Sequence, residues 1–180
     1  MIQAPDEHYH RYSQRPFPAY CFVAGENPHP TEDPQGHSYG QPAEDPRILK
    51  PDKWYENETY LFGVDLYNYA FWWESHEIFE SLWRKVSKND PTSHFLQGLI
   101  KISGAFLKWH LKKQRGLEIL YSGGIGHLQK VLNDSTNYMG INLMNHIAKL
   151  SIHFREVIAE PREWPNPLID YPFIVLEKAE

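Results

Sequence analysis

Proline divides this chain into three parts and limits where long helices can form. Nine prolines lie within the first 51 residues, four lie near the C-terminal end, and only Pro91 lies between these two groups. Proline inside a helix removes a backbone hydrogen bond and clashes with the preceding turn. The distribution therefore predicts a helical domain over residues 57–160, with a proline-rich N-terminal arm over 1–56 and a C-terminal arm over 161–180.

Within the middle part, apolar residues recur with the spacing of one helical face. The pattern is clearest in segment 93–113, where Phe95, Leu99, Ile102 and Phe106 lie at intervals of three and four residues. Similar patterns, separated by loops, predict helices over residues 57–67, 69–87, 93–113, 115–132 and 142–159. The expected fold is all-α, a helical bundle of about five main helices with both arms packed over it.

Two local features refine this prediction. Asn68 is a residue type that commonly caps helix N-termini, so it is expected to begin the second helix. The fourth helix contains Gly123, Gly124 and Gly126, which predict a kink, a break or a close contact with another helix.

The arms carry many aromatic residues, which favours ordered coil laid over the core rather than disorder.

The charge balance and the single cysteine exclude several functional classes. A net charge of −5 argues against a nucleic-acid partner, because neutralising phosphate needs clustered Lys and Arg. Cys21 alone can form neither an internal disulfide nor a multi-thiolate zinc site. No run of 18 apolar residues is present, so no membrane partner is expected, and the first residues lack the pattern of a signal peptide. We therefore expect a cytoplasmic protein.

The segment 72–84, Trp-Trp-Glu-Ser-His-Glu-Ile-Phe-Glu-Ser-Leu-Trp-Arg, concentrates polar groups inside an otherwise apolar helix. A helix turns about 100° per residue, so one face carries the residues that we call the polar stripe: His76, Glu77, Glu80 and Arg84. The opposite face is apolar and comprises Trp72, Phe79, Leu82, Trp83 and Val86. If the bundle packs on the apolar face, the polar stripe is either a functional site or a structural polar network.

The polar stripe lies within a longer motif, Asn-x-x-x-(aromatic)-(aromatic)-Glu-x-His-Glu-x-x-Glu-x-x-Trp, which spans residues 68–83. Together with Phe-Leu-Gln-Gly-Leu-Ile-Lys at 95–101 and the pair Arg115-Gly116, this motif resembles the helical proteins grouped as domain of unknown function 309. The arm segment 16–40 is similar to the N-terminal extension of one branch of that family. The resemblance implies a compact all-helical bundle and supplies no activity.

A divalent metal site is the first interpretation of the polar stripe. His76 and Glu80 lie one turn apart, which is the separation of two metal ligands on one helix. The zincin motif His-Glu-x-x-His is not matched, because Glu80 stands where the second histidine would be. The Glu-x-x-His motif of di-iron bundles is not matched either, because Trp73 stands where the glutamate would be. Further ligands would come from elsewhere. The candidates are His29, Asp33 and His37 of the N-terminal arm, with His146 and His153 of the fifth predicted helix.

A second interpretation of the polar stripe needs no metal. Glu77 and Glu80, one turn apart in an apolar setting, would repel each other, so one carboxyl would hold a proton that His76 could exchange. Glu77 is then the candidate catalytic base. The residues expected to line a small-ligand pocket here are Trp73, Arg84, Gln97 and Lys101. Trp73 has an alternative role, which is to pack under an arm.

The third interpretation is structural. Glu80 would pair with Arg84, His76 would donate to a carboxylate or carbonyl, and the arm histidines would cap turns. The chain would then be a non-catalytic interaction or scaffold protein whose aromatic-rich arms hold a partner or, in a homo-oligomer, another copy. Our leading hypothesis remains a metal- or small-ligand-binding pocket on the polar stripe, with hydrolysis as the reaction to test. The sequence names no substrate, metal, oligomeric state or pathway.

Overall fold

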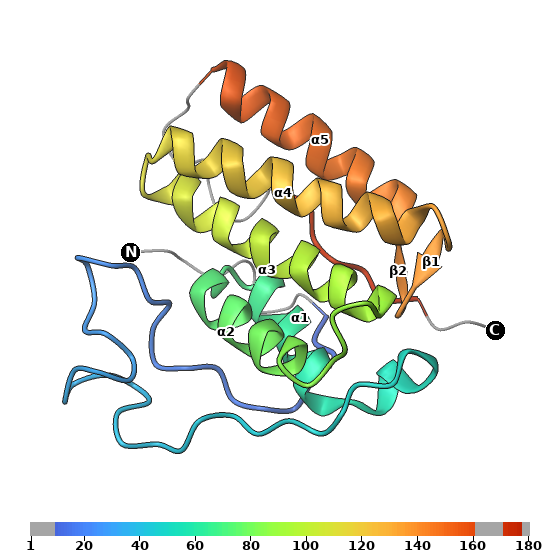
Figure 1. The fold of residues 1–180 in the computed structure, drawn as a ribbon. Coiled ribbons are helices and arrows are strands. Elements are labelled where there is room, and N and C mark those ends of the chain that lie inside the picture. Colours follow the sequence, from blue (N-terminus) through green and yellow to red (C-terminus); the bar gives the residue numbers. More distant parts are fainter. Residues whose placement is uncertain (1–9, 161–170, 178–180) are drawn as a thin grey trace.

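The computed structural model describes residues 10–160 and 171–177, which form a helical bundle (Figure 1). The described part contains five α-helices, one 3-10 helix and one two-stranded ribbon. In chain order the elements are η1 (Pro51–Glu56), α1 (Glu58–Asn68), α2 (Trp72–Trp83), α3 (Pro91–His110), α4 (Gln114–Leu132), β1 (Asn137–Tyr138), β2 (Ile141–Asn142) and α5 (Leu143–Ala159). The all-α prediction is confirmed, and η1 and the ribbon are elements that the sequence patterns did not indicate.

The helix α3 lies at the centre of the bundle. It packs against both α2 and α4, while α1 packs against α2 and α5 packs against α4 (Figure 1). The core between the helices is built from large side chains with almost no exposed surface, among them Trp72, Phe79, Phe95, Phe106 and Phe154. No helix in the described part of the chain is both long enough and apolar enough to cross a membrane.

The junction between α1 and α2 differs from the prediction. Asn68 is the last residue of α1 rather than the N-cap of α2, and its buried side chain bonds the backbone N–H and C=O of Ile174, both at 2.8 Å. The chain then turns through Ala70, which has a φ of 63°, and α2 begins at Trp72. As a result, α2 is shorter at both ends than the predicted 69–87. The capping prediction was wrong because a distant segment takes up the Asn68 side chain.

The helix α4 runs without a break through its glycines, which leaves close helix contact as their role. A Cβ on Gly124 would lie 2.8 Å from the Ile102 side chain of α3. A Cβ on Gly98 of α3 would lie 2.5 Å from the Leu128 side chain of α4. Both distances are shorter than real Cβ contacts, so the missing side chains let α3 and α4 approach closely.

A glycine in the turn of the ribbon allows the ribbon to pack closely against η1. β1 and β2 are antiparallel and joined by Met139 and Gly140, which both have positive φ, 48° and 80°. Tight hairpin turns of this kind favour glycine. A Cβ on Gly140 would also lie 2.6 Å from the ring of Trp54, so glycine is required here for space as well as for backbone conformation.

Residues 10–50 of the N-terminal arm form ordered coil attached to α1 and α2. Asp65 of α1 accepts hydrogen bonds from the backbone N–H groups of Tyr12 and Ser13, at 2.8 and 2.9 Å. Phe17 stacks on Phe71 with ring centroids 5.1 Å apart. These contacts hold the arm against α1 and against the residue that precedes α2.

The C-terminal arm is described only over residues 171–177, because 161–170 and 178–180 lie outside the described residues. Tyr171 and Ile174 are buried in the main core. The backbone N–H of Glu177 donates to the carbonyl of Gly140 at 2.8 Å. This segment therefore packs over α1 and the ribbon.

Candidate metal centre

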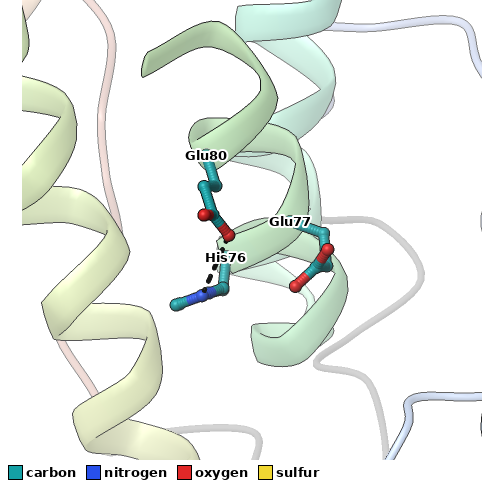
Figure 2. Close-up of side chains that lie close together, drawn as sticks. All are labelled: His76, Glu77 and Glu80. Atoms are coloured by element: carbon teal, nitrogen blue, oxygen red, sulfur yellow. Dashed lines mark ion pairs between the residues drawn. The ribbon is translucent and has the colours of Figure 1, made fainter. Parts of the chain in front are cut away.

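His76, Glu77 and Glu80 form a cluster on α2, which we call the α2 cluster. Each side chain offers one ligand atom, and these three atoms lie within 4.8 Å of one another. Figure 2 shows the three side chains on neighbouring turns, with a dashed line between His76 Nε2 and Glu80 Oε2, which are 3.7 Å apart. Within residues 10–160 and 171–177, this is the one such group of three or more His, Cys, Asp or Glu side chains.

The α2 cluster stays near the surface because the other face of the helix supplies the core. Trp72, Phe79 and Leu82 are at most 1% exposed. A helix with such an apolar face turns its polar face toward solvent. The side chains of His76 and Glu80 remain 35% and 28% exposed, so water and ions can reach them.

The orientation of the His76 ring is set by α3. Its Nδ1 lies 3.2 Å from the backbone carbonyl oxygen of Ile100. A carbonyl oxygen can only accept, so Nδ1 donates to it. Nε2 is the ring nitrogen that faces Glu80. Metal-binding histidines are commonly oriented in this way, with the nitrogen that does not bind the metal donating to a carbonyl or carboxylate.

Glu77 is the member of the cluster whose pKa is raised. Partial burial of its carboxyl is the largest cause, because desolvation disfavours the charged form. The carboxylate of Glu80 raises the pKa further, whereas the positive charges of His76, Arg84 and His29 lower it. The direction agrees with the expectation for two neighbouring carboxyls, although burial contributes more than Glu80 does.

Glu80 divides its two oxygens between two partners. Oε2 faces His76, and Oε1 accepts a hydrogen bond from Arg84 Nη2 at 3.0 Å. The Arg84 side chain is 66% exposed, so this i, i+4 pair contributes only about 0.3–0.5 kcal/mol. Arg84 therefore lies at one end of the polar stripe and leaves that end accessible to solvent.

The N-terminal arm covers the other end of the stripe. Trp73 packs edge-on against Phe22 and His29 of the arm, with ring centroids 5.1 and 5.6 Å apart. Trp73 thus packs under the arm, which is one of the two roles expected for it. His29 lies close enough to Glu77 for its charge to lower the pKa of that carboxyl. Among the arm histidines, His29 is the one that this geometry brings toward the cluster.

His37 has a different partner. Its Nε2 lies 3.1 Å from Oε1 of Glu74, and the two side chains are only 7% and 6% exposed. The same carboxylate oxygen accepts the backbone N–H of Phe22 at 2.8 Å. His37 therefore joins the arm to the first turn of α2 rather than adding to the α2 cluster. Glu74 was not singled out from the sequence, since no local pattern reveals that the arm covers it.

The two residues expected from the neighbouring helix lie on α3. Gln97 is half-buried there. The side chain of Lys101 lies against α4, where a Cβ on Gly123 would be 3.2 Å from Lys101 Cδ, and its charge acts on His127 of α4. Lys101 is therefore directed to α4, and its role as a ligand-binding residue of the stripe stays a prediction.

Two surface cavities lie away from the α2 cluster. One, of about 450 Å³, lies between η1 and the ribbon and is lined by Trp54, Tyr55, Met139 and Gly140 together with neighbouring residues. The other, of about 610 Å³, is lined by polar residues of segment 44–59. A metal ion bound by side chains at the surface needs no such cavity, whereas an organic ligand usually does. Neither of these two cavities is lined by a residue of the polar stripe.

Comparison with known proteins gives one family. The model of the domain of unknown function (DUF309) matches residues 60–120, about a third of the chain, from the third residue of α1 into the first half of α4. The chain thus resembles this family over the segment that carries the α2 cluster, in agreement with the resemblance noted from the sequence. The family description assigns no activity. No curated protein matches the chain.

Proposed function

We propose that this chain is a metal-binding protein that holds a divalent ion at the α2 cluster. The observation that carries the proposal is the orientation of His76. Its Nδ1 donates to the Ile100 carbonyl at 3.2 Å, so Nε2 is the nitrogen that faces Glu80 and that would bind an ion.

The spacing of the cluster suits coordination by one ion. Two ligands of a tetrahedral ion with bonds of about 2.1 Å are roughly 3.4 Å apart. His76 Nε2 and Glu80 Oε2 are 3.7 Å apart, so a small rotation of the Glu80 side chain brings them to that separation. One imidazole and one or two carboxylates form a donor set that suits Zn²⁺.

Glu77 is the residue of the α2 cluster that would take part in a reaction at the metal. A zinc centre with few protein ligands keeps an open position for water, and the metal lowers the pKa of that water toward neutrality. Glu77 would act either as a third ligand or as the base that removes the proton from the water. Burial raises the pKa of its carboxyl, so its carboxylate takes up a proton more readily than an ordinary glutamate does. Hydrolysis is therefore the reaction class to screen once metal binding is established.

A second candidate function is a non-catalytic scaffold. The observation that favours it is the Arg84–Glu80 hydrogen bond at 3.0 Å, which gives the carboxylate a positive partner without any metal. In this alternative the α2 cluster and the arm contact at Trp73 would only order the packing of the arm on α2.

The test is the metal content of untagged protein, measured by elemental mass spectrometry after exposure to Zn²⁺ and desalting. The variants are His76→Gln and Glu80→Gln. The control is Glu118→Gln, which removes an exposed carboxylate on α4 that bonds only Gln114 among the described side chains. We expect each cluster variant to hold close to one equivalent of zinc less than the wild type, and the control to match the wild type.

Two outcomes would decide against the metal centre. Equal zinc in the wild type and in both cluster variants would show that zinc binds elsewhere. No zinc in the wild type, with a lower melting temperature for His76→Gln, would make the cluster a structural network and favour the scaffold function.

A further inference from the structure

A second group of metal-ligand side chains lies where α3 meets α4. His94 Nδ1 and His127 Nδ1 are 3.0 Å apart, and the centroids of the two rings are 5.2 Å apart. We call these residues the histidine pair. Both are half-buried, so solvent reaches them while the helices hold them. Neither residue was expected as a ligand from the sequence, and neither belongs to the α2 cluster.

The histidine pair lies beside the close contact between α3 and α4. His94 lies one turn before Gly98, and His127 lies one turn after Gly124. These are the two glycines at which α3 and α4 approach most closely, against Leu128 and Ile102 respectively. Because a close contact with no spare volume resists sliding, the two imidazoles are held at a fixed separation on rigid elements.

The contact between the two rings is a hydrogen bond. At 3.0 Å, one Nδ1 donates its N–H and the other Nδ1 accepts, so a single proton lies between the two nitrogens. The two ring nitrogens therefore already point toward one shared position.

We propose that the histidine pair is a bis-imidazole site for a transition-metal ion, separate from the α2 cluster. The ion would replace the proton between the two Nδ1 atoms, each ring would carry its proton on Nε2, and water would fill the other positions. Two nitrogens bound at about 2.0–2.1 Å and at right angles are roughly 2.9 Å apart. The observed 3.0 Å is close to this value, which suits the tetragonal geometry of Cu²⁺ or Ni²⁺ and is a little short for tetrahedral Zn²⁺.

The charges around the pair define which ions it excludes. Lys101 and Lys130 make the neighbourhood positive, and both act on His127. Hard ions such as Mg²⁺ and Ca²⁺ depend on carboxylate oxygens and would gain nothing here. An ion that binds nitrogen strongly can offset this repulsion, so the expected order of affinity is Cu²⁺, then Ni²⁺ and Zn²⁺, then Mg²⁺.

The experiment uses full-length untagged protein with the substitution His76→Gln, so that the α2 cluster does not contribute. Calorimetric titration with Cu²⁺ is compared for this protein and for the same protein with His127→Gln or His94→Gln added. We expect one Cu²⁺ site in the parent, weakened on the order of tenfold or more by either added substitution. The control is His10→Gln, which removes an exposed histidine of the N-terminal arm and should leave the affinity unchanged.

Electron paramagnetic resonance of the Cu²⁺-loaded protein gives a second readout that does not depend on stability. Coupling to two imidazole nitrogens is expected in the parent, and to at most one after either His94→Gln or His127→Gln. The proposal is overturned if the parent binds no Cu²⁺, or if affinity and spectrum are the same with and without the histidine pair. Because all these proteins lack His76, the outcome is independent of whether the α2 cluster binds zinc.

Discussion

Two histidines of this chain illustrate how the same residue type is put to different uses. His76 donates from Nδ1 to a backbone carbonyl and keeps Nε2 directed at a carboxylate near solvent. His146 lies in the core beside Tyr67, and its Nε2 has no hydrogen-bond partner among the residues described. His76 is therefore a candidate ligand, because it is partly exposed and its Nε2 faces a carboxylate. His146 is buried, so its main effect is on the stability of the fold.

His146 should make the fold sensitive to acid. Burial lowers its pKa from 6.5 to about 4, with a smaller contribution from the charge of Lys149. Between these two pH values the unfolded chain binds a proton that the folded chain does not, so the free energy of unfolding falls as the pH is lowered. The whole span corresponds to on the order of 3 kcal/mol. Urea denaturation at several pH values between about 7 and 4 measures this loss.

The matching substitutions are His146→Leu and, as a control, His10→Gln. His146→Leu should flatten the pH dependence in this range, because the variant has no buried imidazole to protonate on unfolding. His10 is exposed, so His10→Gln should retain the wild-type slope. A wild-type slope in His146→Leu would mean that other groups cause the acid sensitivity.

At the scale of elements, the contact between α3 and α4 is the feature on which most depends. It is the most extensive helix–helix contact in the bundle, and small residues at Gly98 and Gly124 allow it. The same contact holds the histidine pair together. The close packing of α3 against α4 therefore also sets the distance between the two Nδ1 atoms of the histidine pair.

Alanine substitutions in α4 should have opposite effects at two neighbouring glycines. Gly124→Ala would place a Cβ 2.8 Å from the fully buried Ile102, so we expect it to lower the free energy of unfolding by about 1–2 kcal/mol. Gly126→Ala meets nothing within 4 Å and should raise it by up to about 1 kcal/mol, because alanine favours helix. Denaturation with urea measures both, and a shift in the same direction for both would contradict the close-packing argument.

At the scale of the whole molecule, the N-terminal arm completes the surface of α1 and α2. Its backbone bonds Asp65 on α1, and its His37 and Phe22 N–H bond the buried Glu74 on α2. These contacts join residues that are 37 to 53 positions apart in the chain. The arm is thus part of the fold, and it also brings His29 toward the α2 cluster.

Glu74→Ala should release this part of the arm. The change leaves buried His37 and the Phe22 N–H without their acceptor, and we expect a loss of about 3 kcal/mol. Faster hydrogen exchange at Phe22 and faster proteolysis within residues 24–47 would measure the release. The control is Glu32→Ala in the same arm, whose side chain is 81% exposed. Unchanged exchange at Phe22 in Glu74→Ala would show that the arm is held by its aromatic contacts alone.

The sequence alone determined the features that depend on local periodicity. The spacing of residues such as Phe95, Leu99 and Phe106 predicts α3. The same spacing shows that His76 and Glu80 share one face of α2. These predictions succeed because a helix imposes its own geometry on residues three and four apart, whatever surrounds it.

Only the tertiary structure decided the contacts between residues that are distant in the chain. Asn68 bonds Ile174 instead of capping a helix, His37 meets Glu74 instead of the α2 cluster, and His94 meets His127. No local pattern specifies these pairs, because each depends on how whole elements dock and how closely their backbones approach. Helix faces are set by local backbone geometry, whereas partners across elements are set by packing the core and satisfying the polar groups that it buries.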